Sequence, residues 1–244
     1  MRDAPALRVL LTRPRQDSED TARLLADHNI EAVIAPLIEI SDIAGLSSDL
    51  EHDLDGVQAL LVTSANGVRA LARATPRRDI PVFAVGDASA AAAAQSGFAQ
   101  VASADGDVAA LAALVRDQLV PEDGALLHAA GSAVAGDLAG DLSAHGFTVR
   151  RAQLYRAQTA DKLPAAAQNA LNDGNIDAAL FYSPRTAAQF AKLVKDAGLE
   201  APCEKFVAVC LSRAVAEAVG VLPFAEIRVA ATPDQTALIA ILMQ

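Results

Sequence analysis

The sequence has no tryptophan, only two tyrosines and two cysteines. It also lacks an uninterrupted apolar run of about 18 residues, which argues against a membrane-spanning helix. The segment from Met1 to Pro5 carries no apolar signal-peptide core, so we expect a cytoplasmic protein. Cys203 and Cys210 form no metal-ligand spacing with the four histidines and fit a reducing compartment. Because Cys210 lies within an apolar run, we expect a buried thiol.

Several common catalytic and nucleotide-binding motifs are also missing. The sequence contains no G-x-G-x-x-G after its first strand, no G-x-x-x-x-G-K-[ST], no G-x-S-x-G and no C-x-x-C. These absences argue against dinucleotide-dependent oxidoreduction, P-loop hydrolysis and serine-esterase chemistry. Positive charge is scarce as well, with 20 Lys and Arg against 30 Asp and Glu, a net charge of −10. Broad binding to nucleic acid or to an anionic membrane is therefore not expected. A small anionic ligand held by backbone N–H groups and a few arginines remains compatible with this charge.

The chain does contain a repeated alternation of apolar strands and helices. Its 244 residues are 52% apolar, enough for one large domain or two smaller ones. Three segments of the first half have counterparts in the second half. The pairs are Leu10–Pro36 with Leu126–Arg156, Leu60–Leu71 with Leu180–Ala191, and Phe83–Gly97 with Val207–Gly220. This alternation predicts an α/β protein with two lobes, each a parallel sheet flanked by helices. Locally, the pattern predicts a loop at Pro121–Gly124, a helix from Ala133 to His145, and two extended segments, Phe147–Arg151 and Gln153–Arg156.

The clearest repeated segment is a buried strand that ends in a polar turn and continues as a helix. The strand from Ala59 to Val62 is followed by Thr63, Ser64 and Asn66. The second copy runs from Ala178 through Tyr182 into Ser183-Pro184-Arg185. Ligands of open parallel sheets bind just beyond the carboxyl ends of the strands, where these turns are expected.

Five hydroxyl-rich turns follow predicted strands, and each has two interpretations. Alone, each turn is explained as an ordinary helix cap. Together at one edge of two sheets, they would form a set of N–H and O–H donors for an anionic ligand in a cleft between the lobes. The turns are Thr12-Arg13, Thr63-Ser64, Asp87-Ala88-Ser89, Ser183-Pro184-Arg185 and Ser212-Arg213.

Few side chains are candidates for proton transfer. Tyr155 lies in an extended segment between the two halves and is either a buried structural tyrosine or a proton donor. Tyr182 is expected in the core of its strand. His28 and His145 occupy matching helix ends, where the helix dipole explains them. His128 lies at a strand end and has no partner that the sequence reveals.

An ordered set of motifs resembles the uroporphyrinogen-III synthase family over almost the whole chain. The motifs are Leu10-Leu11-Thr12-Arg13-Pro14, Pro36-Leu37-Ile38-Glu39-Ile40, Val62-Thr63-Ser64-Ala65-Asn66-Gly67-Val68, Ala84-Val85-Gly86, Val149 to Tyr155-Arg156, and Phe181-Tyr182-Ser183. The resemblance implies two flavodoxin-like lobes joined by a two-strand linker. One lobe would combine residues 1–36 with 157–244, and residues 37–156 would form the other. The repeat alone is equally compatible with two sequential lobes.

The resemblance also implies an activity, the cyclisation of the linear tetrapyrrole hydroxymethylbilane without a metal or organic cofactor. Tyr155 matches the family's candidate catalytic tyrosine, and the carboxylate-rich substrate suits the donor-lined turns. The candidate substrate-binding residues are Thr12, Arg13, Thr63, Ser64, Asn66, Gly86, Ser89, Ser183, Arg185 and Ser212. The sequence departs from the family where Cys210 replaces a frequent glycine, near Arg213 where a threonine is frequent, and at Ala135-Gly136-Asp137 where an arginine is frequent.

Two other classes of function fit the same pattern. One is a non-catalytic two-lobed protein that binds or senses a tetrapyrrole or another polyanion. The other is a pair of flavodoxin-like domains for protein interaction. As an enzyme, the protein is expected to be a monomer that contacts the upstream hydroxymethylbilane synthase transiently, and to bind neither nucleic acid nor membrane.

Overall fold

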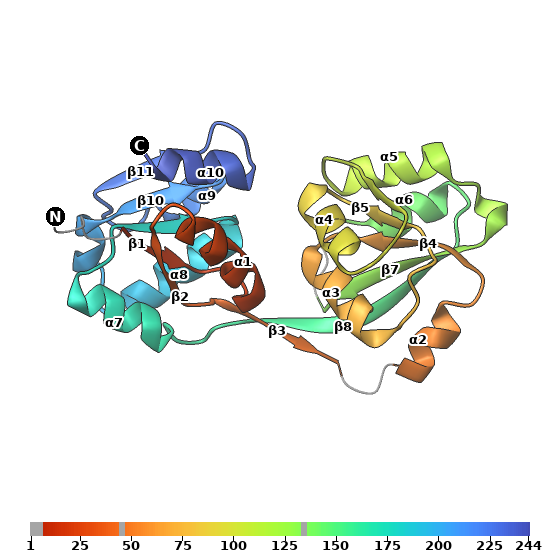
Figure 1. Ribbon diagram of the computed structural model, residues 1–244, viewed down its shortest axis with the longest axis horizontal. Coiled ribbons are helices and arrows are strands. Elements are labelled where there is room, and N and C mark those ends of the chain that lie inside the picture. Colours follow the sequence, from red (N-terminus) through yellow and green to blue (C-terminus); the bar gives the residue numbers. More distant parts are fainter. Residues whose placement is uncertain (1–6, 44–46, 133–135) are drawn as a thin grey trace. The chain divides into compact units, whose positions relative to one another are not determined.

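A computed structural model describes residues 7–43, 47–132 and 136–244. The chain divides into two compact units (Figure 1). Unit 1 comprises Met1–Glu39 and Gln158–Gln244, and unit 2 comprises Ile40–Ala157. The chain passes between the units within β3 (Ile38–Asp42) and again within β8 (Val149–Thr159), two neighbouring strands of one sheet.

Unit 1 is built on a five-stranded sheet with the order β11-β10-β9-β1-β2. Its strands pair in parallel and are β1 (Arg8–Leu11), β2 (Glu31–Ile34), β9 (Ala178–Phe181), β10 (Val207–Cys210) and β11 (Glu226–Val229). One apolar cluster packs the sheet against α7 (Ala165–Asp173), α8 (Pro184–Asp196) and α9 (Arg213–Val219). A second cluster packs it against α1 (Arg15–Ala26) and α10 (Gln235–Leu242). A short 3-10 helix covers Ala201–Lys205.

Unit 2 contains a six-stranded sheet with the order β3-β8-β7-β4-β5-β6. Besides β3 and β8, its strands are β4 (Val57–Val62), β5 (Val82–Ala84), β6 (Val101–Ser103) and β7 (Ala125–Gly131). One apolar cluster includes residues of α3 (Ala65–Ala74) and α4 (Asp87–Gln95). Another includes residues of α5 (Val108–Gln118) and α6 (Leu138–Ala144). The remaining helices of this unit are α2 (Ser47–Asp53) and the 3-10 turn Pro121–Asp123.

The strand orders confirm the fold class and the internal repeat. When β7, β8, β4, β5 and β6 are matched with β1, β2, β9, β10 and β11, both sheets have the same order. In unit 1 this is the flavodoxin-type order 2-1-3-4-5, with a topological switch point between the first and third strands. Unit 2 has the same spatial arrangement in a permuted chain order, because β4, β5 and β6 precede β7 and β8, and it adds β3 beside β8. The switch point lies between β1 and β9 in unit 1 and between β7 and β4 in unit 2.

Some local predictions were wrong. The helix expected from Ala133 to His145 is shorter: residues 133–135 lie outside the described part, and α6 begins at Leu138. The helix starts there because Gly136 has a positive φ of 71° and the Asp137 carboxylate accepts a hydrogen bond from the N–H of Gly140. The two extended segments expected around Gln153 form the single strand β8. The loop expected at Pro121–Gly124 contains a 3-10 turn.

Cys203 and Cys210 are both buried and unpaired, as expected for the second of them. Burial raises the pKa of each thiol to about 12, so both stay protonated and unreactive. Across the described ranges, no helix combines the length and apolar character needed to cross a bilayer.

Candidate active site

The switch point of unit 2 is formed by the carboxyl ends of β4 and β7. Strand β4 ends at Val62, and Ser64 caps α3 by accepting a 3.1 Å hydrogen bond from the backbone N–H of Gly67. The first turn of α3 lies directly against β7, because a Cβ at Gly67 would lie 2.8 Å from the carbonyl oxygen of Ala129. A glycine at this position therefore allows the N-terminus of α3 to reach the switch point.

A β-bulge in β8 places Tyr155 at the same point. Ala130 is opposite Gln153, but the next residue of β7, Gly131, is opposite Tyr155. The extra residue, Leu154, breaks the alternation of β8, so that Leu154 and Tyr155 are both buried. The Tyr155 ring lies on the backbone of Gly131, where an added Cβ would come within 2.7 Å of the ring carbons.

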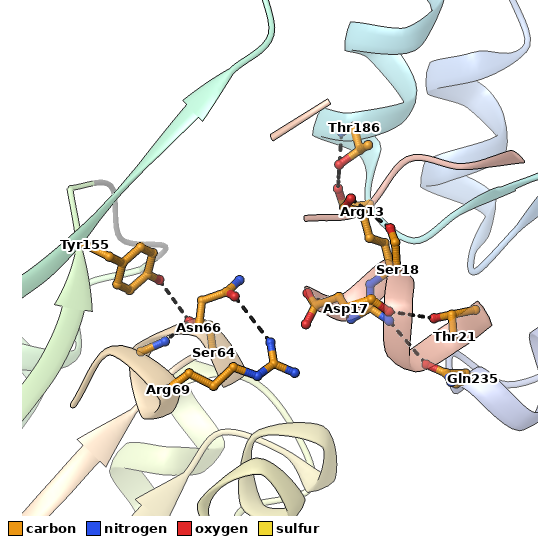
Figure 2. Close-up of polar contacts among 12 residues, drawn as sticks. Arg13, Asp17, Ser18, Thr21, Ser64, Asn66, Arg69, Tyr155, Thr186 and Gln235 are labelled. Carbon is orange, nitrogen blue, oxygen red and sulfur yellow. Dashed lines mark hydrogen bonds and ion pairs between the residues drawn. The ribbon is translucent and has the colours of Figure 1, made fainter. Parts of the chain in front are cut away.

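The hydroxyl of Tyr155 points at Ser64, as Figure 2 shows. Its oxygen lies 2.9 Å from Ser64 Oγ, and either atom can be the donor. Tyr155 is 8% exposed and belongs to the apolar core of unit 2. The structure thus joins the predicted proton donor to one of the predicted ligand-binding hydroxyls.

His128 lies next to Thr63, on the neighbouring strand β7. Its Nε2 is 3.5 Å from Thr63 Oγ1, a contact at the outer limit of a hydrogen bond. Burial, reinforced by the nearby positive charge of Arg151, lowers the pKa of His128 to about 4, so the imidazole is neutral at physiological pH. The guanidinium of Arg151 also donates a 2.8 Å hydrogen bond to the carbonyl of Gly131 and holds the end of β7.

Three further predicted residues of unit 2 lie on the first turns of its helices. Asn66 is in the first turn of α3, where its side-chain oxygen accepts a 3.4 Å hydrogen bond from Arg69 (Figure 2). Gly86 is the N-cap of α4, and the space that a side chain would occupy there is open. Ser89 lies one turn into α4 and is buried. Beside them, the Asp87 carboxylate accepts a 2.7 Å hydrogen bond from the hydroxyl of Ser103 on β6, so this part of the edge also carries a negative charge.

At the switch point of unit 1, the predicted residues Thr12 and Arg13 follow β1. The Thr12 hydroxyl is buried and donates to the carbonyl of Leu180 at 3.3 Å, across the switch point. Arg13 donates to the side chain of Gln235 at 3.2 Å and forms an ion pair with Asp17 at 3.4 Å (Figure 2). Part of the positive charge of this turn is therefore compensated inside unit 1.

The remaining predicted residues of unit 1 begin helices. Ser183 caps α8 through a 3.2 Å hydrogen bond from the N–H of Thr186 and lies 2.8 Å from its hydroxyl. Arg185, in the first turn, donates to the hydroxyl of Thr159 at 3.0 Å. Ser212 is the N-cap of α9, but its side chain makes no capping hydrogen bond. The Ser212 hydroxyl is therefore not used in capping, unlike the Ser183 hydroxyl.

The two tyrosines have different surroundings. Tyr155 belongs to unit 2 and contacts a serine hydroxyl, whereas Tyr182 belongs to unit 1 and lies under Arg13, whose guanidinium carbon is 4.3 Å from the ring centre. Burial raises the pKa of Tyr182, and the positive charge of Arg13 opposes that effect only in part. Tyr182 packs against the apolar core of unit 1, but it is half-buried and follows β9, so its expected place within the strand was wrong.

The sequence predicted most of the polar residues at these strand ends but missed the groups that support them. Thr63, Ser64, Asn66 and Tyr155 gather in unit 2, and Thr12, Arg13, Ser183, Arg185 and Ser212 lie at the corresponding strand ends of unit 1. The missed groups are Gly131, Arg151 and Asp17. Gly131 alone carried a signal, since a glycine at the carboxyl end of a buried strand often marks a close approach.

Comparisons with known proteins were consistent with this geometry. The family model described as uroporphyrinogen-III synthase HemD matches residues 19–240. The uroporphyrinogen-III synthetase of Helicobacter pylori 26695 is 18% identical, with a TM-score of 0.61 over 97% of this chain and 98% of that one. A mutant uroporphyrinogen III synthase of the extremely thermophilic bacterium Thermus thermophilus is 19% identical, with a TM-score of 0.56 over 98% and 96% of the two chains. At such identities the structural likeness shows the fold. No match was found among curated proteins.

Proposed function

Because the chain belongs to the uroporphyrinogen-III synthase family, we propose that it converts hydroxymethylbilane into uroporphyrinogen III. The reaction closes a linear tetrapyrrole with loss of water and inverts the last pyrrole ring through a spiro intermediate. It makes the protein a hydro-lyase of haem biosynthesis. The observation that carries the proposal is the family match, which extends over both units.

The substrate has many carboxylates, and the strand ends of each unit offer donors suited to them. Helices α3 and α8 begin at capped N-termini beside the two switch points, with the positive end of the helix dipole at Ser64 and Ser183. The hydroxyl of Thr63 and the guanidinium of Arg185 add side-chain donors. These groups support binding of a polyanion by a protein whose net charge is −10.

Tyr155 is the proposed acid. Its phenolic proton moves to the hydroxyl of the substrate's hydroxymethyl group, the C–O bond breaks with both electrons on oxygen, and water leaves. The lone pair of the adjacent pyrrole nitrogen stabilises the resulting methylene cation. The last ring attacks this carbon through its substituted position to give the spiro intermediate. The bond from that position to the original bridge carbon then breaks with its electrons left on the ring, the bridge carbon bonds to the ring's unsubstituted α-carbon, and that carbon releases its proton to the phenolate. Proton transfer from a positioned side chain contributes about 10²–10⁴-fold to such steps.

Positioning is the second part of the proposed catalysis. Uncatalysed closure joins the nearer, unsubstituted carbon and gives the symmetric type I isomer. The protein must hold the chain so that the inverted ring reacts first. Because the uncatalysed closure is itself intramolecular, orientation here selects between two ring carbons, and it contributes only a part of the roughly 7–11 kcal/mol by which well-oriented intramolecular reactions exceed bimolecular ones. Carboxylates anchored at capped helix starts would supply that orientation.

Two further proposals concern a partner protein and the location in the cell. Since free hydroxymethylbilane closes spontaneously, a transient contact with the upstream hydroxymethylbilane synthase would shorten its time in solution. We further propose a cytoplasmic location, which suits the unpaired thiols of Cys203 and Cys210.

The test is an isomer analysis of the product. Hydroxymethylbilane is incubated with the protein, the product is oxidised, and the type I and type III porphyrins are separated. We expect type III to predominate. A product with the isomer composition of the protein-free blank would refute the proposal, and unchanged closure accompanied by binding of the tetrapyrrole would indicate a binding protein or sensor instead.

A further inference from the structure

The contact between Ser64 and Tyr155 assigns a role to the serine beyond capping a helix. The oxygen of Ser64 has two lone pairs and one hydrogen. One lone pair accepts the N–H of Gly67, which is a fixed donor in the first turn of α3. The remaining lone pair and the hydroxyl hydrogen are left for the contact with Tyr155, 2.9 Å away.

The direction of this hydrogen bond follows if Tyr155 is the acid. When Tyr155 donates to Ser64, its proton points into the protein and is not available to a ligand. When Ser64 donates to Tyr155, the phenolic proton is free to point outward. In this second arrangement the N–H of Gly67 donates to Ser64, and the hydroxyl of Ser64 donates to Tyr155. Each donor is used once, and both hydrogen bonds run in the same direction along the chain of groups.

The surroundings of the Tyr155 ring fix its position and its orientation toward Ser64. Gly131 supports one face of the ring so closely that a Cβ would overlap its carbon atoms at 2.7 Å. Arg151 holds the carbonyl of Gly131. The N–H of Ser132 donates to the carbonyl of Tyr155 at 3.0 Å. With the ring held in this way, the contact with Ser64 decides where the phenolic hydrogen points.

We propose that Ser64 is a positioning residue that directs the Tyr155 proton outward and then stabilises the phenolate. The inference rests on the proposed function and deepens it. After proton transfer, Ser64 O–H donates to a negatively charged oxygen, and such charge-assisted hydrogen bonds are about twice as strong as neutral ones. The amide of Gly67, at the positive end of the α3 dipole, reinforces this donor.

The kinetic test is a double-mutant cycle that combines Ser64→Ala with Tyr155→Phe. A hydrogen bond to a charged group is worth roughly 1.5–3 kcal/mol, which corresponds to a loss in kcat of about 10- to 150-fold for Ser64→Ala. KM should change much less, and Ser64→Thr, which keeps the hydroxyl, should restore most of the rate. In the Tyr155→Phe background, Ser64→Ala should have little further effect. Equal fold losses in both backgrounds, or a loss confined to KM, would overturn the proposal.

The matched control removes a helix cap without touching Tyr155. Asp107 caps α5 in the same unit by accepting a 3.0 Å hydrogen bond from the N–H of Ala110. Asp107→Ala should therefore reproduce the loss of capping in Ser64→Ala but leave kcat within about twofold of wild type, because Asp107 has no part in the contact that orients the phenol. If Asp107→Ala lowered kcat as much as Ser64→Ala, the kinetic effect would belong to helix capping and the proposal would be wrong.

A spectroscopic measurement separates this inference from the proposed function. In a Tyr182→Phe background Tyr155 is the only tyrosine, so the tyrosine Raman doublet reports whether its hydroxyl donates or accepts. We expect an accepting phenol that loses this signature on Ser64→Ala and keeps it on Asp107→Ala. An unchanged doublet would refute the role of Ser64 even in an active enzyme. A changed doublet in a protein that forms no type III isomer would support the contact and refute the proposed function.

Discussion

The buried His128 makes the stability of unit 2 depend on pH. Its ring is 4% exposed, and burial, followed by the charge of Arg151, lowers its pKa from 6.5 to about 4. In the unfolded chain the same imidazole regains an ordinary pKa near 6.5. Between these two values the unfolded state binds a proton that the folded state does not. The free energy of unfolding therefore falls as the pH is lowered through this window.

The size of the effect follows from the two pKa values. From about pH 7.5 to about pH 5, the unfolded imidazole becomes almost fully protonated while the folded one stays largely neutral. The expected loss is roughly 2 kcal/mol, of the full ~3.4 kcal/mol that a shift of 2.5 pKa units represents. This loss is a substantial part of the stability of a typical domain.

The assay is urea unfolding of the Tyr182→Phe protein and of the same protein carrying His128→Gln. Tyr155 is then the only tyrosine, and its fluorescence reports unfolding of the unit that contains His128. Glutamine does not titrate, so the variant gives the pH dependence of all other groups. The difference between the two proteins should change by about 2 kcal/mol between pH 7.5 and pH 5.

Two results would contradict the lowered pKa of His128 in the folded protein. One is an equal pH dependence in both proteins. The other comes from an NMR titration of the four histidines, in which the resonance that disappears in His128→Gln would titrate near pH 6.5 in the folded protein.

Three further predictions concern packing and capping. Gly131→Ala should displace the ring of Tyr155, cost about 1–3 kcal/mol in urea unfolding and lower kcat, whereas an unchanged kcat would contradict the ring position. Ser183→Ala should destabilise the protein by about 1 kcal/mol and Ser212→Ala by only a few tenths, because only Ser183 makes a capping hydrogen bond; equal losses would argue against this difference. Cys210 should resist iodoacetamide at pH 8 until the chain unfolds, as mass spectrometry would show; rapid labelling of the native protein would disprove its burial.

The sequence was sufficient for features that depend on local patterns. The segments Leu60–Leu71 and Leu180–Ala191 each predicted a buried strand, a hydroxyl turn and a helix, and the structure confirms both. A helix cap in each turn followed from its place before an apolar helix, and the structure shows that Ser64 and Ser183 are the capping residues. These features depend on neighbouring residues, so a single sequence is enough to find them.

Features that depend on distant residues were harder to predict. One local feature was missed as well: alanine favours a helix at every position, so the sequence predicted a helix from Ala133, whereas α6 begins at Leu138, after Gly136 and the cap at Asp137. The partners of His128 come from β4 and β8, strands that local patterns do not align with β7. The bulge at Leu154 left one trace in the sequence. Leu154 and Tyr155 are consecutive large apolar residues, and both are buried in a strand whose buried residues otherwise alternate with more exposed ones.

Counting turnovers distinguishes enzymatic ring inversion from stoichiometric binding of the substrate. Hydroxymethylbilane in large excess is added to a small known amount of protein, and type III porphyrin is quantified against the type I background. We expect many molecules of type III for each molecule of protein, with the initial rate proportional to protein concentration. A yield of type III that never exceeds one molecule per protein, or that equals the blank, would contradict enzymatic ring inversion.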